Sequence, residues 1–268
     1  MASTFSVIVV GILTEHPRKA QEITERCRQY EIPVALASSD EIAASPWREL
    51  WEKLRQECLS EEQLPDYVPT VVIDPCLLST RQRLNSLQNL QRRYPRALWL
   101  RSGLTETATA CAAALQYPEV VAFNGLPSVF QSSDILEIAP ALTASNQALA
   151  TAKDFFASLG FRTEVVADRV GLIIPRILAL LINEGAFTVL ERVAEPNDID
   201  TAMRLATNYP KGVLEWADEI GLDTIVAILD ALHEEYRQER YRTCVLLRQY
   251  VRANRLGRVS GQGFYQYG

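Results

Sequence analysis

The chain of 268 residues is long enough for one large or two modest domains, and its hydrophobic content of 48% is ample for a buried core. Its net charge of −6 and its pI near 5.2 argue against binding to nucleic acid. The longest apolar run, residues 170–182, is interrupted by Pro175 and Arg176, so no membrane span is predicted. No basic residue precedes the short apolar run at the N-terminus, which argues against a signal peptide. These features together predict a cytoplasmic protein.

The cysteines and the C-terminal arginines give no sign of a metal or anion site. The five cysteines are odd in number, widely spread and without a CxxC pair, which predicts reduced thiols and neither a disulfide framework nor a zinc site. An anion site is the alternative for the arginines near the C-terminus, but helix faces with carboxylate partners explain them more simply. These arginines are Arg237, Arg240, Arg242, Arg248, Arg252, Arg255 and Arg258.

The first part of the chain alternates strands and helices. Strands are predicted at Phe5–Ile12, Pro33–Ser38, Pro69–Ile73, Ala97–Arg101, Val120–Phe123, Ile135–Ile138 and Arg162–Val166. Helices are predicted at Pro17–Tyr30, Trp47–Cys58, Thr80–Arg93, Glu106–Leu115 and Ser145–Leu159. This alternation is typical of βαβ units, and it predicts a mostly parallel sheet with helices on both faces.

After Arg169 the strand signals stop. Helices are predicted at Leu172–Arg192, Pro196–Ala206, Leu222–Tyr236 and Val245–Ala253. We therefore expect an α/β domain over residues 1–168, a boundary near Asp168, and an all-helical domain over residues 169–268.

The helical part carries an ordered set of motifs. They are Asp168-Arg-Val-Gly-Leu-Ile-Ile-Pro-Arg176, Ile182-Asn-Glu-Gly-Ala186, Asp198-Ile-Asp200, Asn208-Tyr-Pro-Lys-Gly212, Ala217-Asp-Glu-Ile-Gly-Leu-Asp223 and Arg255-Leu-Gly-Arg-Val-Ser-Gly-Gln-Gly-Phe-Tyr265. In this order and spacing they resemble the C-terminal domain of the 3-hydroxyacyl-CoA dehydrogenase family. The resemblance implies a Rossmann-like nucleotide-binding domain, followed by an all-α domain that forms most of a homodimer interface. It also implies NAD as cofactor and an acyl-CoA or small hydroxy-acid ligand.

In this family a histidine acts as general base and a glutamate orients it. The histidine lies in the motif His-Phe-Phe-Asn-Pro, for which this chain has Phe123-Asn-Gly-Leu-Pro127. Glu137 matches the glutamate, but the histidine position falls on Asn124, or on Gly125 if no insertion is allowed. Neither residue accepts a proton at neutral pH.

Two further catalytic positions also depart from the family pattern. The family holds the substrate oxygen with an asparagine and a serine. The asparagine position falls on Pro175, which has no side-chain donor, and the family's Asn-Thr-Ser-Ser becomes Arg101-Ser-Gly-Leu104. Ser102 is thereby one position away from the expected substrate contact. Of the four catalytic positions, only Glu137 is plainly retained.

The cofactor motif is reduced in the same way. A dinucleotide fold uses Gly-x-Gly-x-x-Gly after its first strand and an acidic residue after its second. The chain keeps Gly11 from the glycine motif. The acidic position falls on Ser38, and Asp40, two residues on, is a candidate substitute.

The chain has only two histidines that could replace the missing base. His16 follows the first predicted strand, and His233 lies in the middle of a predicted helix beside two glutamates. We interpret both as surface residues.

Two functions follow from these observations. The first is a dehydrogenase-like protein with degraded catalytic and NAD-binding motifs, which binds acyl-CoA or another ligand as a dimer and has weak or no activity. The alternative is an active NAD-dependent 3-hydroxyacyl-CoA or hydroxy-acid dehydrogenase with an atypical site. An N-terminal half that binds a different nucleotide, or none, is compatible with either.

Overall fold

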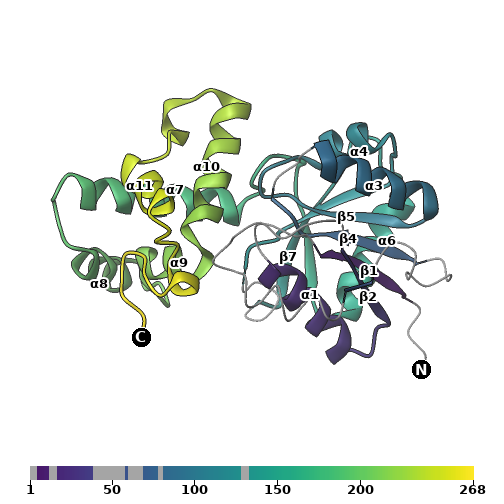
Figure 1. The fold of residues 1–268 in the computed structure, drawn as a ribbon, viewed down its shortest axis with the longest axis horizontal. Helices are drawn as coiled ribbons and strands as arrows, with labels where there is room; N and C mark the ends of the chain where they lie inside the picture. Colours follow the sequence, from purple (N-terminus) through teal and green to yellow (C-terminus); the bar gives the residue numbers. More distant parts are fainter. Residues whose placement is uncertain (1–4, 12–16, 39–57, 60–68, 78–80, 128–132) are drawn as a thin grey trace. The chain divides into compact units, whose positions relative to one another are not determined.

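The structure is a computed structural model, in which residues 5–11, 17–38, 58–59, 69–77, 81–127 and 133–268 are described. The chain divides into two compact units, Met1–Leu172 and Ile173–Gly268 (Figure 1). The first unit contains the strands and the second is helical, as the sequence predicts.

The first unit is built on one sheet of eight strands. They are β1 (Val7–Gly11), β2 (Val34–Ser38), β3 (Cys58–Leu59), β4 (Val71–Asp74), β5 (Leu98–Ser102), β6 (Val120–Phe123), β7 (Ile135–Pro140) and β8 (Arg162–Val165). The order across the sheet is β3-β2-β1-β4-β5-β6-β7-β8, and β6 and β7 pair antiparallel whereas the other neighbours pair parallel. The first six strands have the order of a Rossmann sheet, so the predicted fold class is confirmed.

The helices of the first unit follow the prediction closely. They are α1 (Pro17–Gln29), α3 (Arg81–Arg93), α4 (Ala108–Leu115) and α6 (Asn146–Ser158). The predicted helix Trp47–Cys58 lies outside the described residues except for Cys58, which belongs to the short strand β3 instead. Cys58 pairs there with Leu36 of β2, and this long-range pairing decides its conformation.

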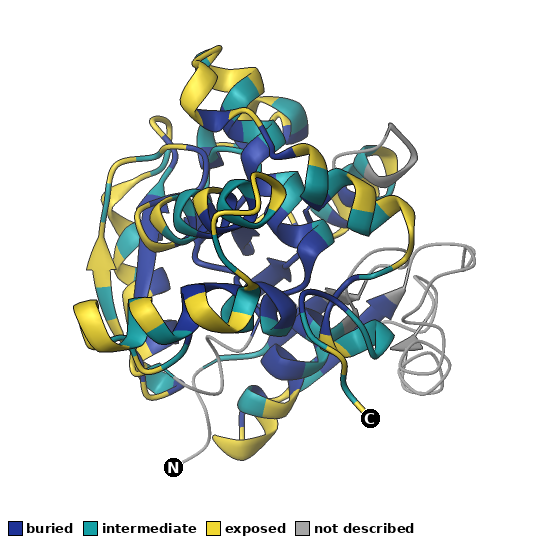
Figure 2. Cartoon of the chain, turned by 90° about the vertical axis from the view of Figure 1, so that its left-hand side faces the viewer, coloured by how far each residue is buried: buried dark blue, intermediate teal, exposed yellow. Residues whose placement is uncertain are grey.

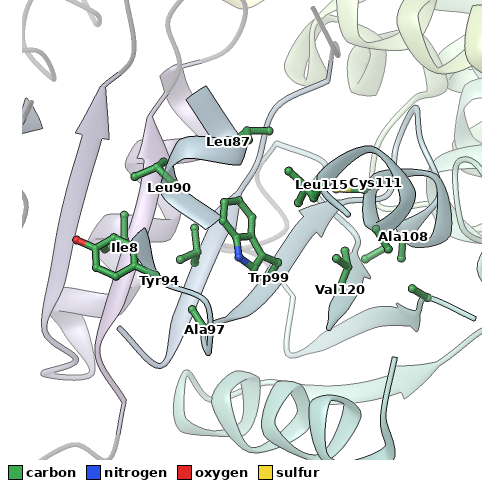
Figure 3. Packing of buried hydrophobic residues seen from close by; sticks show 14 of the residues in the cluster. Ile8, Leu87, Leu90, Tyr94, Ala97, Trp99, Ala108, Cys111, Leu115 and Val120 are labelled. Carbon is green, nitrogen blue, oxygen red and sulfur yellow. The ribbon is translucent and has the colours of Figure 1, made fainter. Parts of the chain in front are cut away.

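A buried apolar cluster on one side of the sheet is centred on the indole of Trp99 (Figure 3). Leu87 and Leu90 of α3, and Cys111 and Leu115 of α4, reach the same cluster. The β4 and β5 strands are buried along their whole length, as expected for a parallel sheet covered on both faces.

The second unit contains α7 (Ile174–Leu190), α8 (Pro196–Thr207), α9 (Val213–Ile220), α10 (Leu222–Tyr236), α11 (Val245–Arg252) and two short 3-10 turns, Glu239–Tyr241 and Arg258–Ser260. Most of these helices have one buried and one exposed face (Figure 2). The sequence analysis did not predict α9, because it is only eight residues long.

The compact units divide after Leu172, whereas the sequence predicts a boundary near Asp168. Asp168 belongs to the first unit through its carboxylate. Its two oxygens accept hydrogen bonds from the backbone N–H groups of Ala108 (2.7 Å) and Thr109 (2.8 Å). Asp168 therefore supplies acceptors for backbone N–H groups in the first turn of α4. These N–H groups have no partner within the helix and favour a negative charge nearby.

Two buried carboxylates organise the second unit. Asp218 accepts hydrogen bonds from the backbone N–H groups of Phe264 and Tyr265, both at 2.9 Å, and from the hydroxyl of Tyr267 at 3.0 Å. A side chain at Gly263 would collide with this carboxylate, so only glycine fits there. The chain after α11 is thereby fastened to α9.

Asp200, in α8, is the second of these carboxylates. Its carboxylate accepts hydrogen bonds from the N–H groups of Leu214 (2.8 Å) and Glu215 (2.9 Å), in the first turn of α9, and from the Tyr265 hydroxyl (2.7 Å). It caps the neighbouring helix, because Gly212 ahead of α9 lets it approach closely.

The C-terminal arginines mostly have intramolecular partners, as predicted. Arg237, Arg242 and Arg248 pair with Glu234, Glu239 and Asp230. Arg240, Arg255 and Arg258 lie over the rings of Tyr241, Tyr250 and Tyr267. Within the described part of the chain, no cluster of metal-ligating side chains and no helix able to cross a membrane is present.

Candidate functional site

The candidate site lies where the parallel strands end. Because β1 to β6 run parallel, their carboxyl ends share one edge of the sheet, where Rossmann folds bind ligands. Gly11 and Ser38, the last residues of β1 and β2, are register partners at this edge. Ser102 ends β5, and Asn124 directly follows β6. Pro175 is in the first turn of α7, which belongs to the second unit.

Asn124 and Glu137 face each other across β6 and β7. The last β6 residue, Phe123, pairs with Ile138, and the backbone N–H of Asn124 donates to the Glu137 carbonyl at 2.9 Å. Directly opposed residues of antiparallel strands project their side chains from the same face. Both residues are nearly buried, with exposed fractions of 5% and 8%. The position opposite Glu137 is therefore that of Asn124.

Gly125 has no room for a side chain. A Cβ atom added to Gly125 would lie 2.5 Å from Oγ and 3.0 Å from Cβ of Ser102. Ser102 is fully buried, and its hydroxyl has no hydrogen-bond partner among the described residues. The side chain of Ser102 thus fills the space in which a histidine at position 125 would have to begin.

We expect Gly125→Ala to lower the free energy of unfolding by about 1–3 kcal/mol, because overpacking a closed site forces neighbours out of place. In the Ser102→Gly background the same substitution should cost clearly less, since the obstructing atoms are gone. Urea unfolding of the two single variants and the double variant measures the coupling. Additive effects of the two substitutions would contradict the steric contact.

A buried ion-pair network, which sequence reasoning missed, joins the ends of β4 and β5. Arg101 and Asp74 are register partners, each about 1% exposed, and the guanidinium is bound to the Asp74 carboxylate. The same guanidinium pairs with Glu106 at 3.2 Å. Asp74 also accepts the backbone N–H of Cys76 at 3.3 Å, so the network holds the segments that follow the two strands.

A signal for this network was present in the sequence. Val71–Ile73 and Leu98–Leu100 are apolar strands, and each is followed at once by a charged residue, Asp74 and Arg101. Charges at the ends of buried strands are seldom fully buried unless they are paired. Their opposite signs on parallel strands indicate an ion pair once the strands are known to be neighbours.

Of the remaining candidate residues, the structure describes only His233. Asp40 and His16 lie outside the described residues. His233 lies in α10 and is partly buried, and its backbone carbonyl accepts the N–H of Arg237 at 2.8 Å. His233 belongs to the second unit, whereas Glu137 belongs to the first.

In a dinucleotide-binding fold, one half of this edge binds the second nucleotide. Here the carboxyl ends of β4, β5 and β6 form that half. Near the ends of β4 and β5, Asp74 and Arg101 are bound to each other. The glycine-motif segment after Gly11, residues 12–16, lies outside the described part of the chain.

Comparison with known proteins supports the resemblance inferred from the motifs. Residues 171–267 match the family model of the 3-hydroxyacyl-CoA dehydrogenase C-terminal domain. A 3-hydroxybutyryl-CoA dehydrogenase of Bradyrhizobium diazoefficiens is 37% identical over 163 residues, which cover 59% of this chain and 54% of that protein. The chain thus matches about half the length of this curated relative.

Two solved structures have the same fold over nearly the whole chain. The (S)-3-hydroxybutyryl-CoA dehydrogenase of Ralstonia eutropha superposes with a TM-score of 0.76 at 21% identity, over 99% of this chain and 100% of that one. FadB2 of Mycobacterium tuberculosis superposes with a TM-score of 0.81 at 22% identity, over 100% of both chains. At such identities the likeness concerns the fold alone. The structural likeness and the sequence match together show a Rossmann-like unit followed by a C-terminal domain of the 3-hydroxyacyl-CoA dehydrogenase family.

Proposed function

We propose that this chain is a 3-hydroxyacyl-CoA dehydrogenase-like protein that binds an acyl-CoA, or a related hydroxy acid, and has weak or no dehydrogenase activity. One observation carries the proposal: the residue opposite Glu137 is Asn124, and the neighbouring Gly125 has no space for a side chain. An amide does not accept a proton at neutral pH, so Asn124 cannot serve as the general base that Glu137 would orient.

The expected loss of reaction rate is large enough to support weak activity. Loss of a general base typically lowers the rate about 10²- to 10⁴-fold. Loss of a hydrogen-bond donor to the reacting oxygen, as expected for Pro175, typically costs about another 10²-fold.

We also propose that the protein is a homodimer that associates through the second unit. The resemblance to the family implies this arrangement. Exposed apolar side chains of the second unit support it, because burying apolar surface favours association. They include Ile174 and Ile177 of α7, Leu205 of α8 and Val245 of α11, which are between 50% and 83% exposed.

An active NAD-dependent 3-hydroxyacyl-CoA or hydroxy-acid dehydrogenase is the second candidate. The match of residues 171–267 and the 37% identity to a 3-hydroxybutyryl-CoA dehydrogenase favour it. This function requires a proton acceptor other than Asn124 and a mode of NAD binding that tolerates the ion pair between Asp74 and Arg101.

The two functions are separated by measuring NADH binding and turnover with purified protein. Energy transfer from the four tryptophans to NADH reports binding, and NADH consumption with acetoacetyl-CoA reports turnover. We expect acyl-CoA binding with turnover at least about 10²-fold below that of a dehydrogenase with an intact base. Rapid NADH consumption would refute the proposal in favour of the active enzyme. Sedimentation equilibrium of the same sample tests the dimer.

A further inference from the structure

The first unit has a cavity at the edge of the sheet opposite to the candidate site. It has a volume of about 360 Å³ and lies at the amino ends of β4, β5 and β6, whereas the candidate site lies at their carboxyl ends. Its lining includes Thr70, Arg96, Leu98, Glu119, Ser145 and Ala148. None of these residues belongs to the candidate site, so the cavity is a separate feature of the first unit.

Glu119 is held in a fixed position on the wall of this cavity. Its backbone carbonyl accepts the N–H of Trp99 at 3.0 Å, which ties it to β5. Its Oε2 atom accepts hydrogen bonds from the backbone N–H and the hydroxyl of Ser145, at 3.1 and 2.8 Å, at the start of α6. Its Oε1 atom accepts no hydrogen bond from the described part of the chain. One oxygen thus anchors the carboxylate, and the other is left for a donor that enters the cavity.

Arg96 brings a positive charge to the same cavity. It is an exposed residue of the turn between α3 and β5. No hydrogen bond or ion pair joins its guanidinium to any residue that the structure describes, Glu119 included. Two opposite charges therefore line one cavity without pairing with each other.

The two charges disfavour the simplest ligands. A ligand with only a negative group is attracted by Arg96 but repelled by Glu119, and a ligand with only a positive group is repelled by Arg96. A small molecule that carries both a carboxylate and an ammonium group satisfies both side chains. The guanidinium matches a carboxylate with its paired N–H donors, and an ammonium group donates to a carboxylate oxygen. Leu98 and Ala148, which are 5% and 6% exposed, give the cavity an apolar surface as well.

We propose that this cavity binds a free amino acid with an aliphatic side chain. The carboxylate of the ligand pairs with Arg96, and its ammonium group donates to Oε1 of Glu119. Its side chain packs against Leu98 and Ala148. Small-ligand sites are typically apolar for the most part, with a few polar groups that fix the orientation of the ligand. The inference is independent of the proposed acyl-CoA binding, because the cavity lies at the other edge of the sheet.

The test uses L-leucine as the probe, in isothermal titration calorimetry with the full-length protein. Two analogues of leucine have the same carbon skeleton apart from one charged group: 4-methylpentanoate lacks the ammonium group, and 3-methylbutylamine lacks the carboxylate. We expect leucine to bind about tenfold more tightly than either analogue, because each analogue loses a hydrogen bond between charged groups.

Two variants test whether leucine binds in this cavity. Glu119→Gln keeps an oxygen for Ser145 and removes the charge, so it should weaken leucine and 3-methylbutylamine about tenfold without weakening 4-methylpentanoate. Arg96→Gln should weaken leucine and 4-methylpentanoate in the same proportion. Arg252→Gln, at an exposed position of α11, is the charge-matched control for Arg96→Gln and should bind leucine as the wild type does.

Each contrary result overturns the inference. Absence of leucine binding at millimolar concentration would show that the cavity is not an amino-acid site. Equal affinities for leucine and either analogue would show that one of the two charges is not used. Leucine binding unchanged by both Arg96→Gln and Glu119→Gln would place the ligand elsewhere on the protein. Arg96 is exposed, so its variant gives a result even if Glu119→Gln does not fold. None of these outcomes depends on whether the chain binds acyl-CoA.

Discussion

Replacing Arg101 by alanine is expected to lower the free energy of unfolding by about 3–5 kcal/mol, because it leaves the carboxylate of Asp74 buried without its counter-charge. Asp74 is about 1% exposed, so water cannot replace the guanidinium without a local opening of the sheet edge. Glu106, which is bound to the same guanidinium, loses this ion pair at the same time.

The matched control is the double variant Asp74→Leu/Arg101→Met, which replaces both charges by apolar side chains of similar size. Such replacements are often nearly neutral, so the double variant should be more stable than Arg101→Ala. Urea unfolding followed by tryptophan fluorescence measures both variants. A loss below about 1 kcal/mol for Arg101→Ala would show that the ion pair is solvated in solution.

Asp218→Ala should lower the free energy of unfolding of the second unit by at least about 3 kcal/mol. The substitution removes the acceptor of three hydrogen bonds, and each buried donor left without a partner costs about 1–3 kcal/mol. The C-terminal segment after Gly257 should also become protease-sensitive, because it loses its attachment to α9. Glu235→Ala, at an exposed position of α10, is the control and should change stability by less than about 0.5 kcal/mol.

The pH dependence of stability provides a second readout for Asp218. Burial raises the pKa of this carboxyl group above its usual value, although the N–H groups of Phe264 and Tyr265 and the Tyr267 hydroxyl lower it in part. A raised pKa in the folded state means that the folded protein binds the proton more tightly than the unfolded chain. Asp218 therefore contributes stability at acid pH that is lost as the pH rises through the folded-state pKa. The stability of the wild type relative to Asp218→Asn should fall as the pH rises above the usual pKa of an aspartate, and a constant difference would contradict this.

The sequence by itself determined the alternation of strands and helices in residues 5–166 and the helical character of the rest. These depend on the periodicity of apolar residues along the chain, which is a local property. The order of the C-terminal motifs likewise indicated the family domain that residues 171–267 match. The sequence also singled out Glu137 and Asn124 as candidate residues, since both lie in recognisable stretches near strand ends.

Only the tertiary structure decided which of these residues meet. The sequence left the histidine position open between Asn124 and Gly125, and the register of β6 and β7 places Asn124 opposite Glu137. The contact between Ser102 and Gly125 arises because β5 and β6 are neighbours. The pairing of Asp74 with Arg101 likewise follows from the register of β4 and β5. Strand order and register are set by the packing of segments far apart in the chain, so local patterns do not determine them.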